Sequence, residues 1–70
     1  MTIYQEAIQR QYPELTEREC AYVEAWMRLE HPSLNGVSPD TFRREVNLSV
    51  ICLRQVALEE NEALALSFGL

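Results

Sequence analysis

Cys20, His31 and Cys52 are the residues of this sequence best suited to nucleophilic or transition-metal chemistry. A nucleophilic thiol needs a base within hydrogen-bonding reach, and the chain has a single histidine and no lysine. The three residues are widely separated, and their spacing matches no compact zinc motif. With only two glycines, the chain also has no glycine-rich phosphate loop. We therefore expect no enzymatic activity, no catalytic residue, no metal and no cofactor, and we expect the two cysteines to be buried free thiols.

Four polar residues near the start of the third predicted helix, Thr41, Arg43, Arg44 and Asn47, have side chains that can contact phosphates or base edges. Residues 37–55 contain three arginines and two acidic residues, a local charge of +1 in a chain whose net charge is −5. This pattern predicts one alternative function, a helix-turn-helix-like DNA-binding protein. The overall negative charge disfavours it, because DNA affinity depends on neutralising phosphates.

Acidic residues outnumber basic ones by 11 to 6, which predicts a second alternative, an acidic inhibitor that mimics DNA. Three Glu–Arg pairs stand at the favourable i, i+4 spacing and should offset much of this charge: Glu6 with Arg10, Glu14 with Arg18, and Glu24 with Arg28. The remaining acids gather at Glu59, Glu60 and Glu62. This cluster resembles the acidic first turn of a helix more than an extended phosphate-like track.

Apolar residues near the C-terminus exceed what the core of a small helical domain needs, and they favour a protein-interaction or regulatory module that acts by binding. The candidate interaction residues lie on the third predicted helix and in the terminal run: Leu48, Ile51, Leu58, Leu64, Leu66 and Phe68. We expect a protein partner or a homodimer to cover them. The alternative is that the terminal segment folds back over the helix and makes a four-helix monomer.

Turn residues divide the chain into helical segments, because no segment alternates with a period of two. The first helix is expected from Ile3 to Gln11, ahead of Pro13. In the second, Thr16 is the predicted N-cap, and the helix should end at Glu30. Its core-facing half is expected to contain Leu15, Tyr22, Val23, Trp26, Met27 and Leu29, and its polar half Glu17, Arg18, Ala21, Glu24 and Arg28.

Residues 32–37 form the predicted loop before the third helix, with Leu34 and Val37 turned into the core. Ser38 and Pro39 are typical of a helix start, and this helix should run to about Leu58. Because it is apolar on two sides, we expect it to be central, either between the other two helices or between its own bundle and a partner subunit. A break near residues 59–61 would then begin a short tail or a fourth helix.

These elements predict an all-α fold for residues 1–70, a three-helix bundle with a short C-terminal helical tail or fourth helix, in a single domain. The apolar fraction of 47% and charged fraction of 24% are typical of a globular chain. The sequence shows neither a signal-peptide core nor an apolar run long enough for a membrane, so we expect a cytoplasmic protein. Small size alone suggests an origin in a phage or other mobile element.

Overall fold

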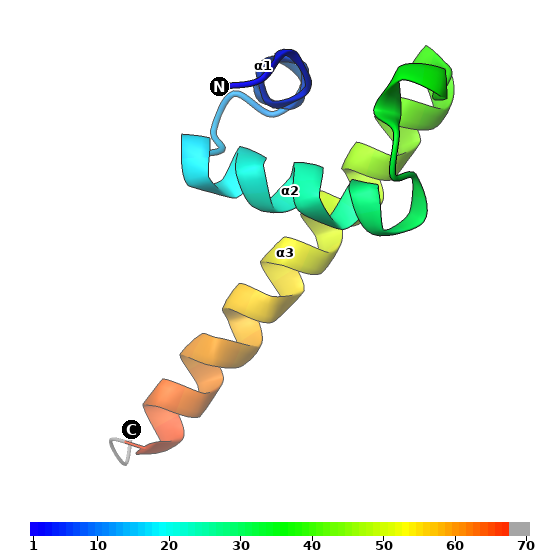
Figure 1. Cartoon of the computed structure of the whole chain (residues 1–70). Coiled ribbons are helices and arrows are strands. Elements are labelled where there is room, and N and C mark those ends of the chain that lie inside the picture. The colour runs from blue at the N-terminus through cyan, green and yellow to red at the C-terminus, as the bar shows by residue number, and fades with distance from the viewer. Residues whose placement is uncertain (68–70) are drawn as a thin grey trace.

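The computed structural model describes the backbone of residues 1–67 and the side chains of residues 1–60. Its elements, in chain order, are α1 (Ile3–Gln11), α2 (Glu17–Glu30), a one-turn 3-10 helix η1 (Leu34–Gly36) and α3 (Pro39–Ser67). Figure 1 shows α2 crossing α3 near the middle of its length, with α1 next to α2, while the second half of α3 extends away from them. Residues 1–67 contain no strand, so the all-α prediction is confirmed.

Side-chain caps fix where each helix begins. The Thr16 hydroxyl accepts a hydrogen bond from the backbone N–H of Glu19 at 3.1 Å, and the Glu19 carboxylate accepts one from the Thr16 N–H at 2.8 Å. This capping box confirms the predicted start of α2. A second capping box, formed by Thr2 and Gln5, begins α1 and was not predicted. The Ser38 hydroxyl caps the first turn of α3, as expected.

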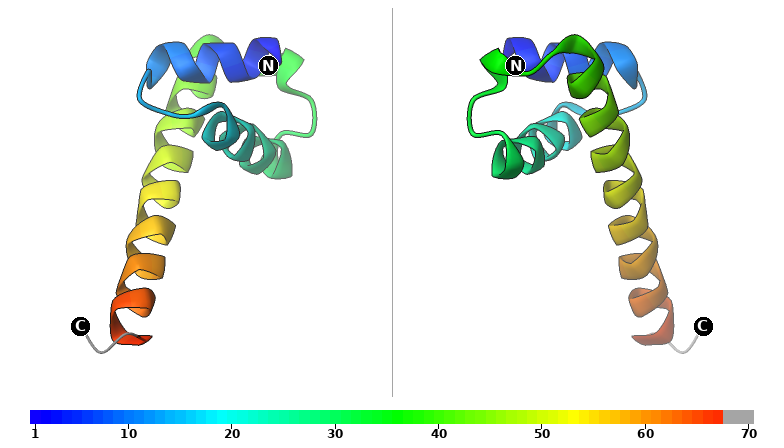
Figure 2. Two further views of the ribbon diagram at one scale, coloured as in Figure 1. Left: turned by 90° about the vertical axis from the view of Figure 1, so that its left-hand side faces the viewer. Right: turned by 90° about the vertical axis from the view of Figure 1, so that its right-hand side faces the viewer.

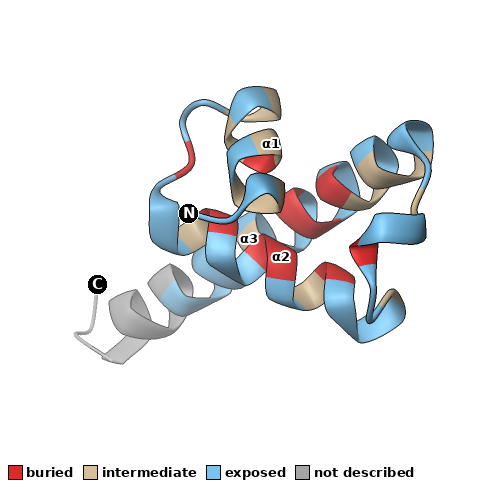
Figure 3. Ribbon diagram, turned by 45° about the horizontal axis from the view of Figure 1, so that its top comes forward, coloured by how far each residue is buried: buried red, intermediate tan, exposed pale blue. Residues whose placement is uncertain are grey.

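The hydrophobic core lies where α1, α2 and the first half of α3 meet (Figure 3). Its buried members are Ile8, Leu15, Cys20, Val23, Met27, Leu34, Val46 and Val50. Tyr4, Tyr12, Val37, Phe42 and Leu53 pack against them and are half-buried. The prediction that Leu34 and Val37 turn into the core is therefore confirmed, and all the side chains of this core lie in the first 53 residues.

The buried face of α2 is narrower than the half of the helix that we predicted. Tyr22 and Leu29 were expected in the core, but they are 47% and 81% exposed, and Trp26 is only half-buried. Conversely, Glu24 was placed on the polar side and is buried. The buried residues of α2 follow the i, i+3, i+4, i+7 spacing of a single stripe, which Glu24 shares and Leu29 does not.

The predictions that α3 ends near Leu58 and that the chain breaks near residues 59–61 are wrong, because α3 is one continuous helix to Ser67. The residues around the expected break are mainly Glu, Ala and Leu, which favour helix, and none is Pro or Gly. Within the described range the chain therefore does not fold back as a fourth helix. Although α3 is long, no helix in this range is apolar enough to cross a membrane.

Of the two positions that we predicted for α3, the one between the other two helices is wrong. The helix contacts α2 and α1 along one side only, and its second half extends into solvent in both views of Figure 2. Residues 54–60 are all exposed. The molecule is accordingly elongated, with principal extents of 48 × 22 × 16 Å.

Candidate interaction surface

Three large apolar side chains of α3 are exposed on the side of the helix away from the core. Leu48, Ile51 and Leu58 are 52%, 62% and 56% exposed. Leu48 and Ile51 lie about one turn apart, and Leu58 lies about two turns further along, so the three share one side of α3. We call these three residues the α3 apolar face. Sequence reasoning identified them, and the structure brings them together on one surface.

The core accounts for the opposite side of α3, where Val46 and Val50 are fully buried against α1 and α2. Beyond this contact, that side continues with the half-buried Leu53 and the small, exposed Ala57. Among the described side chains of α3, the α3 apolar face is therefore the larger exposed apolar surface, and the other large apolar side chain that is exposed is Val56, at 42%. Of the other predicted interaction residues, Leu64 and Leu66 are in α3 but their side chains lie outside the described ones, and Phe68 lies outside the described residues.

The two cysteines occupy different environments. Cys20 is a free thiol in the core, and burial, together with the nearby Glu19 carboxylate, raises its pKa. Cys52 is also a free thiol but is exposed beside Ile51, so the prediction that both are buried is wrong for Cys52. The reason is the position of α3, whose outer side has no covering element among the described residues. The core thiol is unsuited to nucleophilic chemistry because its reactive thiolate form is disfavoured.

Of the three Glu–Arg ion pairs predicted from the i, i+4 spacing, the structure forms one. Glu24 and Arg28 form the expected pair at 2.9 Å. Glu14 instead pairs with Arg54 of α3 at 2.8 Å, across an exposed junction between the α1–α2 loop and the middle of α3. The predicted partner of Glu14, Arg18, lies over the ring of Tyr22. The expected pair of Glu6 with Arg10 is not formed either.

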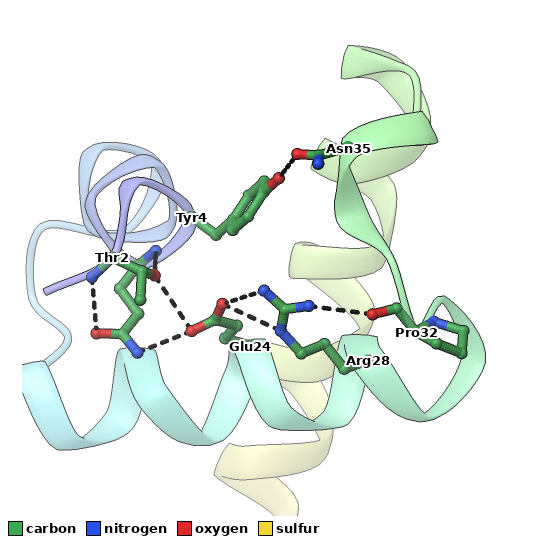
Figure 4. A network of polar contacts seen from close by, with 7 residues as sticks. Thr2, Tyr4, Glu24, Arg28, Pro32 and Asn35 are labelled. Carbon is green, nitrogen blue, oxygen red and sulfur yellow. Dashed lines mark hydrogen bonds and ion pairs between the residues drawn. The ribbon is translucent and has the colours of Figure 1, made fainter.

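The buried Glu24 carboxylate is the centre of a polar network that joins α1, α2 and the following loop (Figure 4). It accepts hydrogen bonds from Gln5 at 2.8 Å and from Thr2 at 3.2 Å, as well as from Arg28. Arg28 also donates to the Pro32 carbonyl at 3.1 Å. Burial alone would raise the pKa of Glu24, but the hydrogen bonds from Arg28, Gln5 and Thr2 and the positive charge of Arg28 lower it.

Two of the four residues predicted to contact nucleic acid, Asn47 and Thr41, instead form side-chain hydrogen bonds within the protein. The Asn47 side-chain carbonyl accepts hydrogen bonds from Gln11 at 2.8 Å and from the Tyr12 hydroxyl. Thr41 belongs to the α3 cap, where its hydroxyl accepts from Ser38. Arg43 and Arg44 remain exposed, and neither forms an ion pair with another residue of the described range.

Arg43 also lines an open groove of about 700 Å³ between α1, η1 and the start of α3. Arg10 reaches the same groove from α1, and the apolar lining of the groove includes Ile3 and Phe42.

A separate polar cluster, near the junction of α2 and α3, consists of Glu30, His31 and Glu45, with one potential ligand atom from each within 4.8 Å of the others. Imidazole and carboxylate groups are common transition-metal ligands, so these residues rather than the cysteines have the closest ligand geometry.

Comparison of the chain with protein-family models, with curated proteins and with solved structures finds no match.

Proposed function

We propose that this protein is a small acidic helical protein-interaction or regulatory module, which acts by binding through the α3 apolar face. The observation that carries the proposal is the exposure of Leu48, Ile51 and Leu58 on one side of a helix that is packed on its other side. Fully burying a side chain of this size contributes about 1.5–3 kcal/mol, so a complementary surface would gain substantial binding energy here. Clustered exposed apolar side chains are typical of protein-binding surfaces.

The length of α3 supports the same proposal. Residues 55–60 of this helix are all exposed, and helices in proteins gain most of their stability from the packing of an apolar face. A partner that packs against α3 would supply that face. Among the described residues, burial raises the pKa of the Cys20 thiol, which disfavours this residue as a nucleophile. The two free thiols are in keeping with a reducing, cytoplasmic setting.

A matched pair of substitutions tests the proposal. Ile51→Glu places a charge in the α3 apolar face, whereas Ala57→Glu places the same charge on the other side of α3. Self-association is measured by sedimentation of the pure protein, and association with other proteins by affinity capture from cells that produce it. We expect Ile51→Glu to reduce at least one form of association and Ala57→Glu to preserve both. Equal behaviour of the two variants in both assays would overturn the proposal.

DNA binding is the second candidate function, supported by the exposed and unpaired guanidinium groups of Arg43 and Arg44 among the described residues. It predicts binding to duplex DNA that weakens as salt is added and that Arg43→Ala with Arg44→Ala removes. A gel-shift assay with mixed genomic fragments at low salt tests it. We expect no shift, because the chain carries a net charge of −5 and Thr41 and Asn47 are engaged internally.

A further inference from the structure

We infer that the partner of the α3 apolar face is a second copy of this chain, with the two α3 helices packed antiparallel. This inference depends on the proposed function, because it assigns an occupant to the same surface. A two-fold dimer requires a self-complementary patch, in which each residue meets a different residue of the second copy. The α3 apolar face meets that requirement through both its apolar spacing and its charges.

Leu48 and Leu58 match when one α3 is reversed against the other. With Leu48 of one copy opposite Leu58 of the second copy, symmetry also places Leu58 opposite Leu48. Ile51 then lies opposite Gln55 of the second copy, one turn further toward the centre. All three side chains are exposed in the single chain and would be covered at once. Because α1 and α2 pack on the other side of α3, the bodies of the two copies would lie on the outside of the pair.

The charges on α3 distinguish antiparallel from parallel packing. Arg44, near the beginning of the helix, and Glu59, in its second half, are exposed and flank the α3 apolar face. In the antiparallel arrangement Arg44 lies within about one turn of Glu59 of the second copy, at both ends of the contact. A parallel arrangement would instead bring arginine beside arginine and glutamate beside glutamate. Antiparallel helix dipoles add to the preference.

Disulfide cross-linking tests the direction of packing. In a Cys52→Ser background, which removes the exposed thiol, chains carrying Leu48→Cys are mixed with chains carrying Leu58→Cys and oxidised. We expect cross-links mainly between the two kinds of chain, and none from Ala57→Cys, the control on the other side of α3. Cross-links mainly within each kind of chain would overturn the antiparallel arrangement.

Charge exchange provides a test that leaves the apolar side chains intact. Sedimentation equilibrium of the otherwise native chain should show a dimer that Arg44→Glu weakens by about fivefold. The double variant Arg44→Glu with Glu59→Arg should recover the native affinity. Failure of the double variant to recover it would count against the pairing.

Sedimentation also separates failure of this inference from failure of the proposed function. A native chain that stays monomeric from micromolar to millimolar concentration would overturn the second copy as the occupant. If Ile51→Glu then still abolished capture of another protein while Ala57→Glu did not, the interaction surface would stand with a different partner. If neither substitution affected capture, both proposals would fail.

Discussion

The Arg28 guanidinium donates to the Glu24 carboxylate through Nη2 at 2.9 Å and through Nε at 3.2 Å, one turn apart on α2. The same carboxylate accepts hydrogen bonds from Gln5 and Thr2 at the start of α1. Glu24 is only 6% exposed, so this group joins α1 to α2 from within the packed body. It stabilises the platform against which α3 packs.

Removal of this carboxylate should destabilise the fold. We expect Glu24→Ala to lower the free energy of unfolding by about 1–3 kcal/mol, because the part-buried hydrogen bonds that Gln5, Thr2 and Arg28 donate to this buried carboxylate are lost together. Glu30→Ala, an exposed change on the same helix, should alter it by no more than about 0.5 kcal/mol. Urea denaturation of both variants measures the difference. Equal loss in the two variants would show that the network contributes nothing specific.

The pH dependence of stability should reflect the lowered pKa of Glu24. A carboxyl whose pKa is lower in the folded than in the unfolded state contributes stability above its unfolded pKa, about 4.3, and loses it as the pH falls through the folded value. We therefore expect the native chain to lose more stability between pH 6 and pH 3 than Glu24→Gln does. Thermal unfolding across this range measures the loss. Parallel pH profiles would contradict the assignment.

Two apolar residues of α2 should respond very differently to truncation. Met27 is 1% exposed and Leu29 is 81% exposed. We expect Met27→Ala to cost about 2–5 kcal/mol, because it leaves a cavity in the core. Leu29→Ala should change stability by less than about 0.5 kcal/mol. Chemical denaturation distinguishes them, and a cost for Leu29→Ala close to that for Met27→Ala would mean that α2 buries a different side.

The thiols provide a probe that needs no stability measurement. Cys52 is exposed, whereas Cys20 is buried and its pKa is raised. In the folded protein a thiol reagent should modify one cysteine rapidly and the other only after denaturation, and Cys52→Ser should abolish the rapid phase. Rapid modification that persists in Cys52→Ser would show that the core around Cys20 opens readily.

Local signals predicted much of this fold from the sequence. The caps at Thr16 and Ser38 and the stop before Pro13 depend on a few neighbouring residues, and the structure confirms the helix boundaries that they set. The course of α3 beyond Leu58 was mispredicted, because an acidic cluster suits the interior of an exposed helix as well as a new N-terminus. Without a breaking residue, helix propensity prevailed.

Burial was harder to predict, because it depends on how the helices cross. The prediction assigned three residues to the wrong sides of α2: Tyr22, Leu29 and Glu24. A helical wheel identifies the apolar half of a helix, but it does not show the narrower stripe that the neighbouring helices bury. By contrast, Leu48, Ile51 and Leu58 were singled out from the sequence. They stood on a different side of the helix from the Val46 and Val50 stripe, and the structure leaves them exposed.

The comparison of Ile51→Glu with Ala57→Glu in sedimentation and capture tests the interaction surface most directly. Each native dimer would bury two Ile51 side chains, so Ile51→Glu should weaken self-association by at least about 100-fold, while Ala57→Glu leaves it unchanged. Circular dichroism should show the same helix content in both isolated chains. The account predicts loss of association in the first variant only. Equal association of both variants, with themselves and with other proteins, would contradict it.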